Sequence, residues 1–200
     1  MAIDREKIIT ELSKLDLRSD EKGIISGFGV LLQHLPATIW TLFSERFTRA
    51  VPNELLEAAE YLLVDAAHEC AYHTGYGIIT SEEWKAVVEP MIKTTEDILH
   101  GAFAIFTAWG WGKVEIQELI PGEKLVLRAY DYYEADVVEY GKSSKMSAYL
   151  ITGASAAFMD LAYGGNYDPT GKKGLGTFEA KQVKGIECGD DYGEVVVTKI

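Results

Sequence analysis

TAWGWGKVEIQELIPGEKLVLRAYDYY, residues 107–133, holds the strongest strand–turn–strand pattern in this chain. On both sides of its centre, apolar side chains alternate with polar ones at a period of two, as a half-buried strand requires. Between the two runs lies Ile120-Pro121-Gly122-Glu123, in which proline fixes φ and glycine accepts a positive φ. The pattern therefore predicts an antiparallel hairpin closed by a type II turn.

The segments on either side of this hairpin predict the rest of the sheet. A helix is predicted from about Thr95, and it is apolar almost all round from Ile98 to Ala108, which indicates burial. A second helix is predicted from about Lys145 to Tyr163, and its small-residue run Gly153–Ala157 favours close approach of a sheet or a ligand. Strands are predicted at 177–187 and 194–200. A helix between two hairpins predicts an α+β fold, with one four-stranded antiparallel sheet packed by helices and preceded by N-terminal helices.

The first 52 residues are predicted to form a helical extension to a domain at 53–200. Residues 23–43 contain no charged side chain, and this uncharged segment is long enough to cross a bilayer. Pro36 and the polar residues beside it disfavour a membrane span. A buried or subunit-interface pair of helices is the preferred interpretation, and it predicts a homodimer.

Composition excludes several kinds of partner. The chain has 200 residues, 48% of them hydrophobic and 25% charged, as in a globular protein. Its formal net charge of −12 repels phosphate backbones and anionic lipid, so nucleic acid and membrane surfaces are not expected partners. Two cysteines and the absence of a secretory leader pattern predict a cytoplasmic protein.

Aromatic side chains gather at both ends of the central hairpin. Trp109 and Trp111 precede it, while Tyr130 and Tyr132 leave it and share a face in a regular strand. Such side chains form the wall of an apolar ligand site, because their rings cover a wide area and keep a polar group. Ordinary core packing is the alternative interpretation.

Two aspartate–histidine pairs at i, i+3 on predicted helices give the strongest metal-ligand pattern: Asp65 with His68, and Asp97 with His100. With Glu57 or Glu60 added, they are similar to the sites of di-iron carboxylate bundles. Those sites use glutamate, and aspartate is one methylene shorter. The alternative is that these side chains face solvent or make single hydrogen bonds.

Four stretches together resemble one known family: WGWG at 109–112, LIPGEKLVLRAYDYYEA, AYLITGASAAFMDLAYGG and FEAKQVKGIECGDDYGEVVV. They are similar to the vinyl-reductase-type domain family, also called hydrocarbon-binding domains, over roughly residues 56–200. The resemblance implies an antiparallel sheet with packed helices. It also implies a pocket for a small apolar molecule, such as the aromatic effectors of phenol-responsive regulators.

Many members of that family carry a zinc site in the last hairpin, and the resemblance places its ligand positions on Gln182, Gly185 and Gly193. A further family cysteine falls on Ala148. None of these four residues offers a thiolate or a carboxylate, and Cys188 alone cannot hold a structural zinc. We therefore expect the fold and the pocket without the metal, and no other cofactor.

The hypothesis for function is the binding of a small apolar or aromatic molecule by a sensor or carrier domain, with no catalytic residue. The pocket is expected between the sheet and helices 95–108 and 147–163. Its lining is predicted to be His100, as a polar anchor, with Phe103, Phe106, Trp109, Trp111, Tyr130, Tyr132, Tyr149, Phe158 and Met159. The alternatives are a metal-dependent enzyme at the two aspartate–histidine pairs and a pure dimerisation module.

Overall fold

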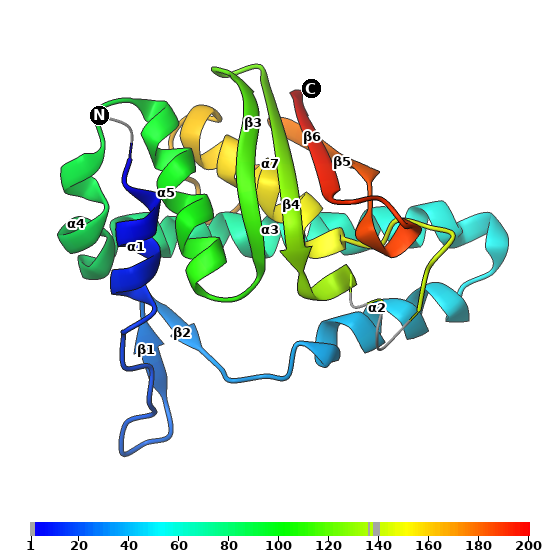
Figure 1. Cartoon of the computed structure of the whole chain (residues 1–200), viewed down its shortest axis with the longest axis horizontal. Helices are drawn as coiled ribbons and strands as arrows, with labels where there is room; N and C mark the ends of the chain where they lie inside the picture. Colours follow the sequence, from blue (N-terminus) through cyan, green and yellow to red (C-terminus); the bar gives the residue numbers. More distant parts are fainter. Residues whose placement is uncertain (1–2, 136, 138–140) are drawn as a thin grey trace.

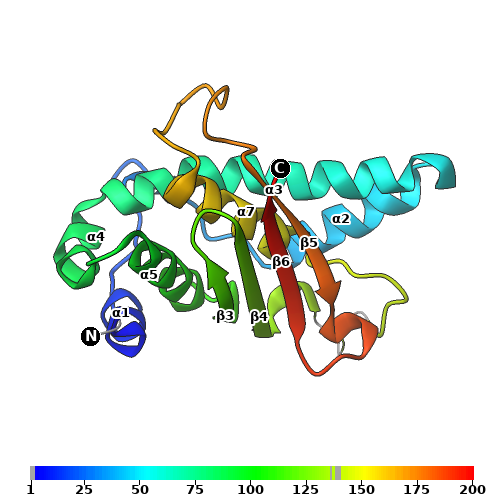
Figure 2. The same cartoon turned by 90° about the horizontal axis from the view of Figure 1, so that it is seen from above.

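A four-stranded antiparallel sheet forms the centre of the computed structural model, which describes residues 3–135, 137 and 141–200. The strands lie in the spatial order β3 (Gly112–Ile120), β4 (Lys124–Tyr132), β6 (Gly193–Lys199) and β5 (Phe178–Lys184). Helix α7 (Tyr149–Tyr163) crosses one face of the sheet, and α3 (Leu56–Thr80) lies beyond α7 (Figures 1 and 2). The predicted α+β class and hairpin–helix–hairpin order are confirmed.

The central hairpin has the predicted turn. Glu123 N donates to Ile120 O over 3.0 Å, and Gly122 has a φ of +70°. Beyond the turn, Leu125 and Leu127 of β4 are buried with Val195 and Val197 of β6 on the face that α7 covers. The opposite face has no helix on it in Figure 2 and carries mostly polar side chains.

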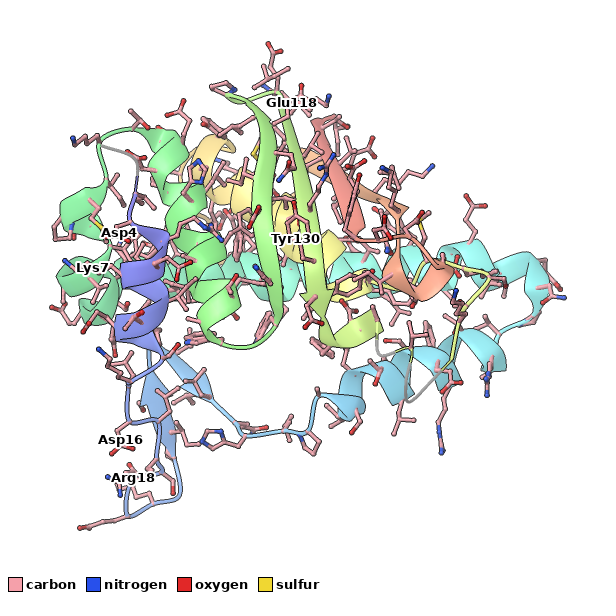
Figure 3. The ribbon with its side chains drawn as sticks, in the orientation of Figure 1. Asp4, Lys7, Asp16, Arg18, Glu118 and Tyr130 are labelled. Carbon is pink, nitrogen blue, oxygen red and sulfur yellow. The ribbon has the colours of Figure 1, made fainter. Side chains whose placement is uncertain are left out.

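A β-bulge at Tyr130 breaks the expected alternation. Lys113 pairs with Asp131 and Val114 with Ala129, so Tyr130 has no residue opposite it. The extra residue shifts the side chains beyond it to the other face. Tyr130 is therefore 39% exposed on the uncovered face of β4 (Figure 3), whereas Tyr132 is buried. The prediction that these two tyrosines share a face is wrong.

The small residues of α7 allow its backbone to approach α3 closely. A Cβ atom placed on Gly153 would lie 2.4 Å from Val64 O and 2.6 Å from His68 N. Ala154, Ala156 and Ala157 are also buried. The predicted close approach is observed at Gly153, but the approaching element is helix α3 and neither the sheet nor a ligand.

The N-terminal part builds a second core. Helix α1 (Arg5–Leu12) packs on α5 (Thr95–Ala108), next to the short helix α4 (Glu82–Val87) (Figure 1). Short 3-10 turns complete the chain at Asn53–Leu55, Glu89–Met91, Tyr133–Ala135 and Ile186–Cys188. The buried apolar residues of this core include Ile8, Leu12, Phe28, Trp84, Val88 and Ile105.

Residues 23–43 do not form the predicted pair of helices. They contain a short hairpin, β1 (Ile25–Gly27) and β2 (Val30–Leu32), and then the start of α2 (Thr38–Ala50). The glycine-flanked Phe28 explains the difference, because its φ of +54° helps to reverse the chain between β1 and β2 and its fully buried ring packs against Trp109. Among the described residues, no helix has the length and apolar character needed to cross a membrane.

Replacing Gly153 by alanine tests the α3–α7 contact. The new methyl group would meet the α3 backbone, so we expect the free energy of unfolding to fall by about 1–3 kcal/mol. The comparison variant is Gly77→Ala on α3, whose Cβ would lie 2.5 Å from a Val30 methyl group and 3.4 Å from the nearest backbone atoms, so that it meets a side chain before backbone. Urea unfolding of both variants measures the difference, and equal losses would contradict this role for Gly153.

Candidate functional site

Five of the predicted aromatic residues come together between α5, β3 and α7, and we call them the aromatic cluster: Phe103, Phe106, Trp109, Trp111 and Phe158. The Phe103 and Phe158 rings meet edge to face with centroids 5.0 Å apart, and those of Phe106 and Trp111 are 5.1 Å apart. Both geometries are favourable for aromatic pairs. The structure thus brings together the predicted aromatic residues that α5, α7 and the segment just before β3 contribute.

Trp109 joins this cluster to the N-terminal core. Its ring lies 4.6 Å from that of Phe28, edge to face, and 6.4 Å from that of Trp111. Sequence reasoning missed Phe28, because it precedes Trp109 by 81 positions in a segment predicted to be helical. The signal available was the Gly-Phe-Gly triplet at 27–29, which is typical of a turn.

The indole nitrogen of Trp109 has no hydrogen-bond partner. Within the described part of the chain, it is one of two buried side-chain polar atoms in this state, the other being the Tyr163 hydroxyl. Such an atom is uncommon, because a buried donor without an acceptor costs about 1–3 kcal/mol. The Trp109 N–H is thus a free donor within an apolar environment.

A narrow apolar crevice borders the Trp109 side chain. It has a volume of about 20 Å³ and lies between α3, α5 and α7, with Gly75, Ala102 and Phe106 in its wall. A second void of about 10 Å³ shares Gly75, Ala102 and Phe158 with it. Each has room for about one water molecule. Phe158 lies in both walls and is the largest of the residues that they share.

The other predicted lining residues lie elsewhere. Tyr130 is on the uncovered face of the sheet, where its ring is 6.2 Å from that of Tyr192. Tyr132 donates a hydrogen bond to Glu187. Tyr149, the first residue of α7, lies near Glu60 of α3. Met159 is buried in the main core. Tyr132 and Met159 belong to the same hydrophobic core as Phe103, Phe106 and Phe158, but neither of them lines the crevice.

His100 lies on the side of α5 that packs near α1. Its backbone oxygen accepts a hydrogen bond from Arg5 over 3.1 Å. Burial and the adjacent guanidinium of Arg5 lower the pKa of the His100 imidazole. His100 is absent from the wall of the crevice, which includes Trp109 and the polar side chain of Thr74.

The two aspartate–histidine pairs do not form a metal site. His68 Nε2 is 2.7 Å from Asp160 Oδ2 on α7, and Asp97 caps α5 by accepting from the Lys93 and Thr94 amides. Asp65 is exposed. In the part of the chain that the structure describes, no three His, Cys, Asp or Glu side chains are grouped to hold a metal. The predicted di-iron-like arrangement is wrong.

The zinc positions implied by the family resemblance do come together, but the residues present do not fit a metal. A Cβ on Gly185 would lie 2.7 Å from the Glu187 carboxylate, and a Cβ on Gly193 would lie 2.7 Å from the Tyr132 ring. Gln182 accepts the Ala148 N–H over 3.0 Å. Tyr132 and Glu187 are not at the family's metal-ligand positions. Their side chains fill the space that metal-binding side chains at positions 185 and 193 would need.

A larger, more polar cavity of about 390 Å³ lies at the N-terminus of α7, where Trp40, Glu60, Glu134 and Tyr149 line it. Glu134 is buried and accepts from Trp40 Nε1 over 2.9 Å and from the Leu150 and Ile151 amides. Desolvation is the main reason that the pKa of Glu134 is raised to about 7, and the Glu187 charge adds to it. Sequence reasoning missed Glu134, because a lone glutamate after a strand carries no distinctive signal.

The raised pKa of Glu134 predicts a pH-dependent stability. Below pH 4.5, the ordinary value for glutamate, the carboxyl is protonated in both the folded and the unfolded chain. Between that pH and about 7, only the unfolded chain releases the proton, so stability falls as pH rises. The loss is on the order of 3 kcal/mol at about 1.4 kcal/mol per pKa unit.

Urea unfolding of wild type and Glu134→Gln between pH 4.5 and 8 measures this effect. The fall in stability should be missing from Glu134→Gln and should persist in the exposed control Glu123→Gln. A pH profile that is the same in wild type and Glu134→Gln would show that Glu134 is not the group responsible.

Comparison with known proteins supports the fold. No family model matches the chain, and no curated protein matches it. The phenol-responsive sensory domain of the transcription activator PoxR, solved with phenol, has a TM-score of 0.68 at 12% identity, over 100% of this chain and 92% of that one. Trafficking protein particle complex subunit 3 from Naegleria fowleri, covalently bound to palmitic acid, has a TM-score of 0.52 at 12% identity, over 82% and 97%.

A vinyl-4-reductase family protein from Methanocaldococcus jannaschii has a TM-score of 0.47 at 11% identity, over 98% of this chain and 92% of that one. That score is below the range that supports an inference. At identities of 12%, the first two likenesses show a shared fold and nothing finer. This chain therefore has a fold similar to that of the PoxR sensory domain.

Proposed function

We propose that this chain binds a small aromatic molecule carrying an acceptor oxygen, in the crevice beside Trp109, and acts as a cytoplasmic sensor or carrier domain. The observation that supports this most strongly is the buried Trp109 N–H without a partner. An acceptor atom on a ligand would remove the cost of that unpaired donor. A ligand lacking such an atom would leave the cost in place.

The surroundings of Trp109 favour an aromatic molecule. The crevice wall is formed mainly by apolar side chains, with Phe106, Trp111 and Phe158 presenting their rings. Edge-to-face contacts with such rings stabilise a bound aromatic ring beyond the burial of its area. The solved PoxR domain, of similar fold, holds phenol, and the similarly folded trafficking subunit holds palmitic acid. Both support an apolar ligand for this fold.

Binding requires the crevice to widen. An engineered cavity that binds benzene in another protein has a volume of about 150 Å³, whereas this crevice has about 20 Å³. Phe158 is the side chain best placed to enlarge the space by moving, because it is the largest of the residues that line both the crevice and the second void. We therefore propose that the ligand selects a state in which Phe158 adopts another rotamer.

Trp109→Phe tests the donor directly. Phenol and toluene have similar shapes, but only phenol offers an oxygen. We expect Trp109→Phe to weaken phenol binding by about 10-fold, the equivalent of one hydrogen bond, and to leave toluene binding within a factor of two. Isothermal titration calorimetry measures both affinities.

Trp111→Phe is the matched control, since Trp111 belongs to the same cluster and its N–H is not among the unpaired buried atoms. Phe158→Ala provides a second variant, because it should enlarge the crevice and strengthen toluene binding. If wild type and Phe158→Ala both fail to bind phenol and toluene, the proposed site is wrong. If Trp109→Phe binds phenol as wild type does, the role of Trp109 is wrong.

An assembly role is supported by a separate surface. Helices α2 and α3 present large apolar side chains to solvent, among them Phe43 at 55% exposure and Leu62 at 54%. The Phe43 and Phe47 rings stack with centroids 5.9 Å apart on the same outer side of α2. Large exposed apolar side chains gathered on neighbouring helices are typical of a protein interface. We propose that the chain forms a homodimer through this surface.

Light scattering at micromolar concentration tests the dimer. Wild type should have twice the mass of the 22.1 kDa chain, and Phe43→Glu should be monomeric, because a carboxylate would be buried without a partner. The control Phe47→Leu keeps the surface apolar and should stay dimeric. A monomeric wild type would contradict the proposed interface.

A further inference from the structure

Three side chains at the end of the sheet hold the N-terminus of α7, and we call them the Tyr132–Gln182–Glu187 cluster. The Tyr132 hydroxyl donates to Glu187 Oε2, and Gln182 Nε2 donates to Glu187 Oε1 over 2.8 Å. Tyr132 Oη in turn accepts the Ile186 N–H over 3.2 Å. The cluster therefore links β4, β5 and the connection between β5 and β6.

The same cluster reaches across to α7. Glu187 Oε1 accepts the Ser147 N–H over 2.8 Å, and Gln182 Oε1 accepts the Ala148 N–H over 3.0 Å. These amides lie just before the first turn of α7, where a helix leaves N–H groups without internal partners. A carboxylate is favoured at this position because the helix dipole is positive there.

We propose that the Tyr132–Gln182–Glu187 cluster is a metal-free clamp, which fixes the last hairpin to α7 by hydrogen bonds at the place where the resembled family has a zinc site. The glycines at positions 185 and 193 leave the space that the Glu187 and Tyr132 side chains occupy. Neither position has room for a ligand side chain, because Glu187 occupies the space beside Gly185 and Tyr132 occupies the space beside Gly193.

The chemistry of the cluster suits a permanent clamp. Burial and the Glu187 charge raise the pKa of Tyr132, so its hydroxyl remains a donor across the physiological range. Hydrogen bonds to an ionised carboxylate are stronger than those between neutral groups. Glu187 accepts hydrogen bonds from three donors, which are the Tyr132 hydroxyl, Gln182 Nε2 and the Ser147 amide. Loss of one donor therefore weakens the hydrogen bonds of the other two. The clamp also fixes the position of α7, which carries Phe158.

The test is a double-mutant cycle with Tyr132→Phe and Glu187→Gln, both of which keep the shape of the side chain. Each variant should lower the melting temperature by roughly 3–10 °C, since a buried partner is left unpaired. The double variant should melt no lower than the worse single variant, because both substitutions remove the same bond. Tyr130→Phe, an exposed tyrosine on the same strand, should melt as wild type.

Hydrogen exchange separates a clamp from general packing. In Tyr132→Phe, amides at 147–151 and 184–188 should exchange at least 10-fold faster, while those at the centre of α3 should not change. This measurement decides the question by itself if Glu187→Gln does not fold. Uniformly faster exchange, or additive losses in the cycle, would overturn the proposal.

The absence of a metal requirement is tested on wild-type protein. Dialysis against a chelator should leave the melting temperature unchanged, and an equimolar addition of zinc should not raise it. A zinc-dependent rise of several degrees would overturn the metal-free clamp. This result would not bear on the aromatic site, which is tested with phenol and toluene.

Discussion

The close backbone contact between α3 and α7 is the constraint on which the rest of the structure depends. It exists because Gly153 has no Cβ at the point where the Val64 carbonyl and the His68 amide of α3 approach. With α3 on one side and the sheet on the other, α7 is buried along most of its length. Small residues are therefore required in its middle, while larger side chains such as Phe158 and Met159 are accommodated nearer its C-terminal end.

Buried polar side chains fix α7 at both ends. At its N-terminus, Glu134, Gln182 and Glu187 accept the free backbone amides. Near its C-terminus, Asp160 pairs with His68 and accepts the Gly176, Thr177 and Phe178 amides, which ties the glycine-rich loop to the start of β5. A helix held in this way is a rigid wall for the aromatic cluster. Movement on ligand binding is then expected in side chains such as Phe158 more than in the backbone.

Local patterns predicted most of the sheet and α5, because strand alternation, the Pro-Gly turn and apolar periodicity act over a few residues. The aromatic cluster was also largely predictable, since α5 and α7 were expected to cover the sheet. The misses required non-local information. The bulge that separates Tyr130 from Tyr132 depends on pairing with β3, and the partners of His68 and Glu134 depend on how the helices meet. The hairpin at 25–32 was not predicted, because the uncharged composition of residues 23–43 favoured a pair of helices.

The central claim is that the unpaired Trp109 N–H is the polar contact of an aromatic ligand site. The chain has four tryptophans, so its indole N–H resonances can be assigned individually by NMR. Saturating phenol should move the Trp109 indole proton downfield, as expected when a donor gains an acceptor, and toluene should not. Phenol binding that leaves the Trp109 resonance unchanged, or that instead shifts Trp40 in the polar cavity at the N-terminus of α7, would contradict this account.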